Sequence, residues 1–163
     1  MVICGIQVIL HPLLAKIQKN KSVTIYKVKN RSEVDEMLRH KAYRFRIYPT
    51  KEQEILIAKT IGCSRFVYNH FLHLWNEAYL ETGKGLSYHA CSASLPKMKT
   101  SDETYWLKEV DSIALQSSVK NLADAFTRFF NKQNNYPLFK SKRYPVQSYL
   151  TKNVHNSIEV KGK

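Results

Sequence analysis

KAYRFRIYPTKEQEILIAKTIGCSRFVYNHFLHLWNEAY, residues 41–79, is the stretch that decides the fold. Its first residues alternate between apolar and polar side chains, which predicts a strand at Tyr43–Tyr48. One face of that strand would be apolar, and the other would carry Arg44, Arg46 and Tyr48. Cations and an aromatic ring on one face suit a surface that contacts phosphates and stacks bases. Pro49 ends the strand, and a helix is predicted to follow.

Two helices are predicted after the strand. Thr50 and Gln53 have the spacing of a capping box, which predicts a first helix at Thr50–Ile61. Gly62-Cys63-Ser64 would form a turn, with Ser64 capping a second helix that ends near Leu80. This pair is typical of a helix-turn-helix, in which the second helix would present Arg65 and Asn69 to base edges. The alternative for these polar residues is an ordinary solvated helix face.

The rest of the chain is predicted to add a few further elements. A short helix at Ser87–Leu95 would end before Pro96, and a polar loop would follow at Lys97–Glu103. Asp111 or Ser112 would begin a long helix with an apolar stripe formed by Leu115, Val119, Leu122, Phe126 and Phe129. Strands are predicted at Tyr149–Thr151 and Ser157–Val160. The fold class is therefore mainly α with a few β-strands, an α+β protein.

The charge of the chain indicates a polyanionic partner. Lysine and arginine number 26 against 13 acidic residues, which gives a net charge of +13 over 163 residues. The segment from Arg128 to Lys152 has no acidic residue and interleaves its cations with aromatic residues. Cations neutralise phosphates and aromatic rings stack on bases, so Lys140, Lys142 and Arg143 join the candidate nucleic-acid-binding residues. The alternatives are a solvated loop, and for the whole chain a basic protein without a specific partner.

No catalytic residue, metal site, cofactor, small-molecule substrate or membrane partner is predicted. The acidic residues fall on helix surfaces and helix starts, where they commonly serve as caps. Cys4, Cys63 and Cys91 form no CxxC pair, which fits reduced thiols and a cytoplasmic protein.

Three sequence blocks resemble OrfB/TnpB-type transposases of insertion sequences, a family of RNA-guided DNA nucleases. The first is the opening stretch, and the second runs from WLKEVDS at Trp106 to Phe130. The third contains Tyr136-Pro137, Phe139–Arg143 and Gln147-Ser148-Tyr149. The resemblance implies an amino-terminal nucleic-acid-binding part, followed in the family by a RuvC-like nuclease with a zinc ribbon. Neither the family's catalytic acids nor its four cysteines occur here, so we expect a truncated fragment that is not an enzyme by itself.

The resemblance also implies a domain organisation. Residues 37–151 would form the nucleic-acid-binding domain, with the helix-turn-helix-like region attached to an incomplete wedge-type small barrel. Residues 152–163 would be the truncated start of the next region. Residues 1–36 would be an extension outside the family match, without order, and Met37 an alternative start of translation. Two alternatives stay open: residues 1–36 as a real strand-forming appendage, with a strand at Val23–Val28, and the whole chain as a self-standing helix-turn-helix DNA-binding regulator.

Overall fold

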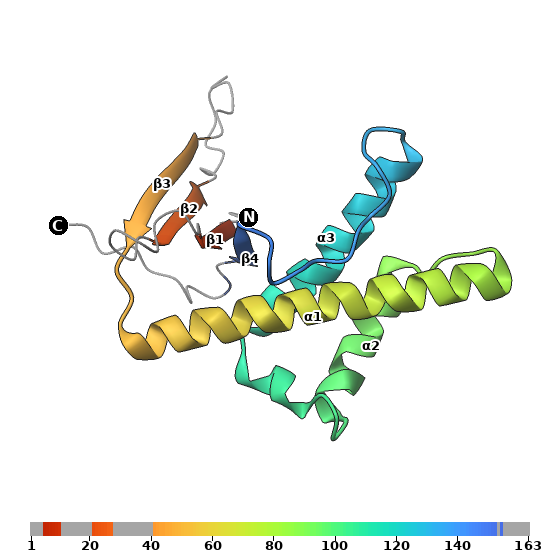
Figure 1. Ribbon diagram of the computed structural model, residues 1–163, viewed down its shortest axis with the longest axis horizontal. Helices are drawn as coiled ribbons and strands as arrows, with labels where there is room; N and C mark the ends of the chain where they lie inside the picture. Colours follow the sequence, from red (N-terminus) through yellow and green to blue (C-terminus); the bar gives the residue numbers. More distant parts are fainter. Residues whose placement is uncertain (1–4, 11–20, 28–40, 153, 155–163) are drawn as a thin grey trace, which may run out of the picture. The chain divides into compact units, whose positions relative to one another are not determined.

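The chain divides into two compact units. The computed structural model describes residues 5–10, 21–27, 41–152 and 154. A sheet unit draws its described residues from the ranges 1–49 and 145–163, and a helical unit is continuous from Thr50 to Tyr144. The described residues form three α-helices and four strands, whose course along the chain can be followed in Figure 1. The α+β class with a predominance of helix is thereby confirmed.

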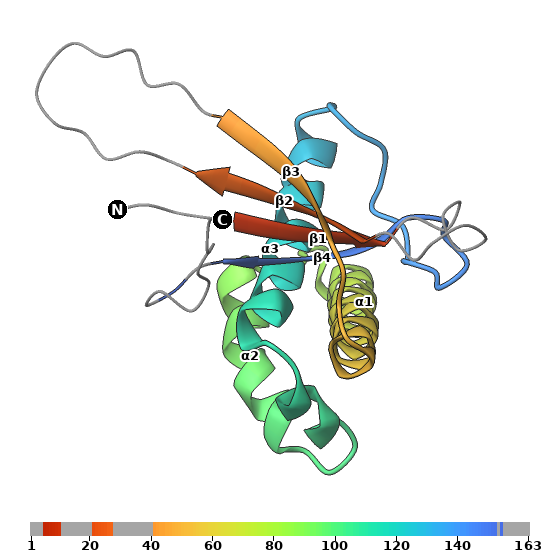
Figure 2. The ribbon, with the colours of Figure 1, turned by 90° about the vertical axis from the view of Figure 1, so that its left-hand side faces the viewer.

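The sheet unit is built from four antiparallel strands. They are β1 (Gly5–Leu10), β2 (Lys21–Lys27), β3 (Lys41–Ile47) and β4 (Gln147–Lys152). Their order is β3-β2-β1-β4, and the strands lie side by side in Figure 2. The predicted strands in β3 and β4 are confirmed, whereas Ser157–Val160 lies outside the described residues. The four described strands form an open sheet, and the wedge-type barrel stays a prediction.

The range 1–36 contributes two of these strands. β2 pairs with β3, with Val23 opposite Phe45, and β1 pairs with β4, with Ile6 opposite Thr151. A strand at Lys21–Lys27 agrees with the alternative that this range forms a strand-bearing appendage. The domain boundary at Met37 stays a prediction.

The helical unit begins with one long helix, α1, from Lys51 to Thr82. The predicted capping box is confirmed: the Thr50 N–H donates to Gln53 Oε1 at 2.9 Å, and the Gln53 N–H donates to Thr50 Oγ1 at 3.3 Å. At the other end Gly83 adopts a φ of 69°, the left-handed conformation that glycine adopts most readily at a helix end. The capping box at the start of the helix therefore acts as the sequence indicates, and Gly83 caps its other end.

The predicted turn at Gly62–Ser64 is wrong, because these residues lie in the interior of α1. Gly62 does not have a positive φ, and Cys63 and Ser64 on its carboxyl side are both buried. Ser64 caps no helix, and among the described residues its buried hydroxyl has no hydrogen-bond partner. Burial of the residues around Gly62 thus outweighs the weak helix propensity of one glycine, which costs only about 1 kcal/mol.

Two further helices complete the unit. The helix α2 spans Tyr88–Thr100, with Ser87 as its cap, and the helix α3 spans Ser112–Phe130, with the Asp111 carboxylate accepting from the Ile113 N–H at 2.8 Å. A 3-10 turn, η2, lies between them at Tyr105–Glu109. The predicted end of α2 before Pro96 is wrong, and so is most of the predicted polar loop. A proline inside a helix loses one backbone hydrogen bond and crowds the preceding turn, and burial of the neighbouring Leu95 favours the helix in spite of this cost.

The core of the helical unit lies where α3 packs on α1 (Figure 1). The apolar stripe predicted for α3 is largely buried, with Phe129 only partly so. Fully buried side chains include Val67, Phe71, Leu72, Leu107, Leu115 and Val119. Among the described residues, none of the helices combines the length and the apolarity that crossing a bilayer requires.

Candidate nucleic-acid interface

The predicted binding residues fall into two groups, one in each unit. Arg44 and Arg46 lie on β3, opposite Thr24 and Ser22 of β2, and Tyr48 follows that strand with 76% of its surface exposed. The helical unit holds the second group: Arg65, Asn69, Lys140, Lys142 and Arg143.

Within the helical unit, the structure brings Asn69 and Lys140 into direct contact. The Asn69 side-chain Nδ2 donates to the Lys140 carbonyl oxygen at 2.9 Å, and the Lys140 N–H donates to Asn69 Oδ1 at 2.8 Å. Asn69 therefore binds the backbone of a residue that lies 71 positions away in the sequence. In the helix-turn-helix hypothesis the Asn69 amide would contact base edges, but here it binds the backbone of Lys140.

The side chain of Lys140 lies against α1 as well. Its ammonium is 4.1 Å from the centroid of the Tyr68 ring, a cation–π contact. Although the residue as a whole is exposed, burial of the ammonium end lowers the pKa of Lys140. Burial raises the pKa of the Tyr68 hydroxyl, and the positive charge of Arg128 partly opposes that rise. The ammonium group of Lys140 therefore packs against α1, whereas Lys142 and Arg143 are exposed.

Lys142 and Arg143 occupy the tip of a short turn, Ser141–Tyr144, called here the basic turn. The Tyr144 N–H donates to the Ser141 carbonyl oxygen at 3.2 Å, and the Arg143 N–H donates to Ser141 Oγ at 3.1 Å. The two cations are the central residues of this turn, and both are exposed. Phe139 before the turn and Tyr144 at its end are 57% and 67% exposed. The turn therefore presents two neighbouring cations flanked by two accessible aromatic rings.

A second contact along α1 holds the start of the same segment. The Tyr136 hydroxyl donates to Asn76 Oδ1, and the Tyr136 ring packs edge-on against Phe126 and Phe129 of α3 at 5.7 and 5.2 Å between centroids. Pro137 beside it is buried. Asn69 and Asn76 are two helical turns apart, so the segment 136–140 lies along one face of α1. Sequence reasoning missed both contacts, because no local pattern links positions so far apart in the chain.

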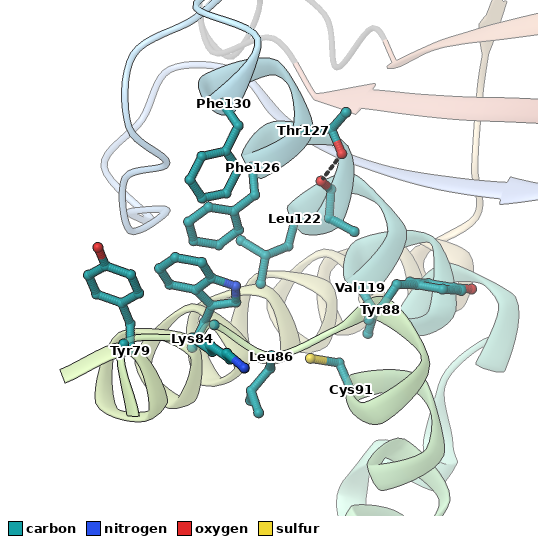
Figure 3. Close-up of a pocket in the computed structure, with 14 residues that line it drawn as sticks. Tyr79, Lys84, Leu86, Tyr88, Cys91, Val119, Leu122, Phe126, Thr127 and Phe130 are labelled. Carbon is teal, nitrogen blue, oxygen red and sulfur yellow. Dashed lines mark hydrogen bonds between the residues drawn. The ribbon is translucent and has the colours of Figure 1, made fainter. Parts of the chain in front are cut away.

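An apolar cavity of about 540 Å³ lies elsewhere in the helical unit, between the end of α1, the start of α2 and the second half of α3. Figure 3 shows Tyr79, Phe126 and Phe130 around it, with Cys91 of α2 on its opposite side. Trp75 stacks on both Phe126 and Tyr79, at 3.9 and 5.4 Å between ring centroids. None of the predicted binding residues lines this cavity.

Several acidic side chains of the helical unit are paired with nearby cations or histidine. Within the described residues, no three His, Cys, Asp or Glu side chains come together in a way that could hold a metal ion. His73 pairs with Glu77 at 3.2 Å and Lys59 pairs with Glu109 at 2.6 Å. Burial raises the pKa of both Cys63 and Cys91, which makes these thiols weak nucleophiles near neutral pH.

Comparison with known proteins places these features in a family. A model of the OrfB_IS605 helix-turn-helix domain matches residues 37–84. The virulence protein VsdF of Salmonella dublin is 37% identical over 105 residues, which cover 59% of this chain and 88% of VsdF. The chain belongs to the OrfB/TnpB family of insertion-sequence transposases. In this member, the part of the matched domain that follows Thr50 is one continuous helix and its glycine cap.

Two longer relatives carry the same region. A Streptomyces pristinaespiralis protein named "Putative RNA-guided DNA endonuclease" is 38% identical over 103 residues, covering 63% of this chain and 26% of the relative. InsQ of Escherichia coli K12, which carries the same description, is 35% identical over 115 residues, covering 67% of this chain and 29% of InsQ. The chain thus spans between a quarter and a third of the length of these two relatives.

Proposed function

We propose that this OrfB/TnpB family member is a nucleic-acid-binding module that grips phosphates through the basic turn. The observation that carries the proposal is the exposure of Lys142 and Arg143 at the tip of a turn whose base is fixed to α1. Cations that neutralise phosphates release counterions, and exposed aromatic rings beside them can stack on unpaired bases. Phe139 and Tyr144 occupy such positions on either side of the two cations.

The sheet unit adds a second candidate surface in this proposal. Arg44 and Arg46 are two residues apart on β3, which is the spacing of positions that share one face of a strand. Tyr48, just after the strand, is exposed. Arg65 of α1 is the remaining candidate in the helical unit. The partner would be DNA, a guide RNA or both, which is the chemistry that the names of the two longer relatives imply.

We further propose that these 163 residues bind nucleic acid and do not cut it. Two-metal cleavage of a phosphodiester requires acidic side chains that converge on the metal ions. The dispersed acids of the helical unit, many of them exposed, support this part of the proposal. A self-standing regulator would need a separate recognition helix, and the continuity of α1 favours the transposase module instead.

A salt titration tests the binding proposal. Replacing Lys142 and Arg143 together by alanine should weaken binding to a mixed-sequence RNA or DNA and reduce the slope of log K against log salt by up to about two phosphate contacts. The matched control replaces Lys97 and Lys108, which are exposed on α2 and η2, and changes the net charge equally. An unchanged slope in the Lys142/Arg143 variant would remove the basic turn from the interface. Equal losses in both variants would mean that only net charge matters.

A nuclease assay tests the proposal that these residues do not cut nucleic acid. We expect no nicking of DNA with Mg²⁺ or Mn²⁺, in the presence or absence of RNA. Metal-dependent cleavage that disappears when an acidic residue of this chain is mutated would overturn this proposal.

A further inference from the structure

The two hydrogen bonds between Asn69 and Lys140 have the pattern of a clamp. One amide group donates to a backbone carbonyl and accepts from the N–H of the same residue, at 2.9 and 2.8 Å. The oxygen of an asparagine amide can accept two hydrogen bonds and its NH₂ group can donate two, and this contact uses one of each. Lys140 is thereby fixed at its backbone, and not only through its flexible side chain.

The clamp lies directly beside the basic turn. Lys140 precedes Ser141, the residue whose carbonyl and hydroxyl oxygens both accept bonds within the turn. On the other side, Tyr136 is held by Asn76 and by T-shaped ring contacts with Phe126 and Phe129. The segment 136–140 is therefore anchored at both ends, and the orientation of Lys142 and Arg143 depends on the anchor nearer to them.

The clamp also conflicts with direct base reading by Asn69. An asparagine that recognises adenine uses its oxygen and its NH₂ group together, in a bidentate contact. Lys140 already binds the Oδ1 and Nδ2 edge of the amide that such a contact uses. Bidentate base reading through this edge would require release of the Lys140 backbone, which would loosen the turn that the proposed function needs.

We propose that Asn69 is a positioning residue, which orders the basic turn so that Lys142 and Arg143 meet phosphates with little loss of conformational freedom. This inference rests on the proposed function, because it assigns Asn69 a role in how the turn binds. A pre-ordered binding segment gains affinity by avoiding the entropy cost of ordering on contact. Asn69 acts through Lys140 and the turn, without touching the nucleic acid itself.

A double-mutant cycle tests the inference, with a labelled mixed-sequence single-stranded RNA as the probe. Asn69→Ala should weaken binding on the order of tenfold in the parent protein, since two hydrogen bonds at the base of the turn are lost. The same substitution should have almost no effect in the Lys142→Ala/Arg143→Ala background, where there is no charged pair left to position. Asn121→Ala, at an exposed position of α3, is the matched control and should bind like the parent.

The outcomes separate the inference from the function beneath it. If Lys142→Ala/Arg143→Ala binds like the parent, the proposed function of the turn has failed, and with it any role in positioning. If that variant binds weakly but Asn69→Ala weakens it further by the same factor, Asn69 contacts RNA itself and only the positioning inference has failed. An Asn69→Ala variant that binds like the parent also overturns the inference.

Two further measurements guard against a simple loss of folding. Tyr136→Phe keeps the ring contacts and removes only the hydroxyl that donates to Asn76. It should therefore weaken RNA binding less than Asn69→Ala does, and this effect should likewise disappear in the Lys142→Ala/Arg143→Ala background. Hydrogen exchange reports on the clamp directly, because the Lys140 N–H is bonded to Asn69 Oδ1. That amide should exchange faster in Asn69→Ala while amides in the core of α1 keep their protection. Unchanged exchange at Lys140 would show that the clamp does not hold the turn in solution.

Discussion

Gly62 gives the sharpest test of the helical unit, because alanine at this position has opposite effects in a continuous helix and in a turn. Glycine in a helix interior is about 0.8–1.0 kcal/mol less favourable than alanine. A Cβ added at Gly62 would meet no atom within 4 Å, so no steric cost opposes this gain. Gly62→Ala should therefore raise the free energy of unfolding by close to 1 kcal/mol.

A turn at the same position would reverse the sign. If Gly62 adopted a positive φ between two helices, alanine there would cost about 1–2 kcal/mol. Gly83→Ala provides the matched comparison within the same protein. Gly83 has a φ of 69°, and it also has no atom within 4 Å of an added Cβ. Its substitution should therefore cost backbone strain alone, about 1–2 kcal/mol.

Urea denaturation followed by circular dichroism of the helices measures both variants against the parent. The structure predicts a higher midpoint for Gly62→Ala and a lower one for Gly83→Ala. Ser64→Ala adds an independent check, since a helix cap would lose about 1 kcal/mol. The Ser64 hydroxyl is buried and has no hydrogen-bond partner within the part of the chain that the structure describes, so its removal should instead leave stability unchanged or raise it. Destabilisation by both Gly62→Ala and Ser64→Ala would refute the continuous helix.

Three further outcomes are expected. Phe71→Ala should cost about 3–5 kcal/mol in urea denaturation, because the ring is only 1% exposed in the core between α1 and α3; a loss below 1 kcal/mol would contradict this packing. Burial, and then the charge of His73, lower the pKa of His70 in the folded protein, while Glu77 opposes the shift. Because the folded protein binds this proton less readily than the unfolded chain does, protonation of His70 favours unfolding. The free energy of unfolding is therefore unaffected above the unfolded pKa near 6.5, and it falls as the pH drops from there through the lower folded pKa. A pH series of unfolding curves should show that decline, and His70→Gln should flatten it. Deleting residues 1–36 removes the described partners of β3 and β4 but no residue of the helical unit, so the helical dichroism should persist; its loss would mean that the units do not fold independently.

Local signals in the sequence predicted where α1 and α3 begin. The Thr50–Gln53 capping box and the Asp111 cap each depend on residues within a few positions of one another. The same rules failed at Gly62 and at Pro96, where burial of neighbouring side chains offsets a poor local propensity. Glycine and proline therefore predicted breaks that tertiary packing overrides.

Features that depend on distant residues were beyond the reach of sequence patterns. The exposure of Lys142 and Arg143 agrees with the prediction of a basic segment, because charge and hydropathy are local properties. The contact of Asn69 with Lys140 and that of Asn76 with Tyr136 join residues 71 and 60 positions apart. The sequence places Arg65 and Asn69 on one helix, but no local pattern could show that the chain's own segment contacts Asn69.

The order of the strands has a consequence for folding during synthesis. β1 is made first, yet one of its two neighbours, β4, leaves the ribosome only after the entire helical unit. The helical unit is continuous and can fold as soon as Tyr144 has emerged, whereas the Ile6–Thr151 pairing must close a loop of nearly the whole chain. Until then β1 keeps one unpaired edge, a site at which nascent chains on neighbouring ribosomes can associate. Slow translation of the region before β4 would lengthen this exposure, and chaperones that bind open strand edges would have their greatest effect in that interval.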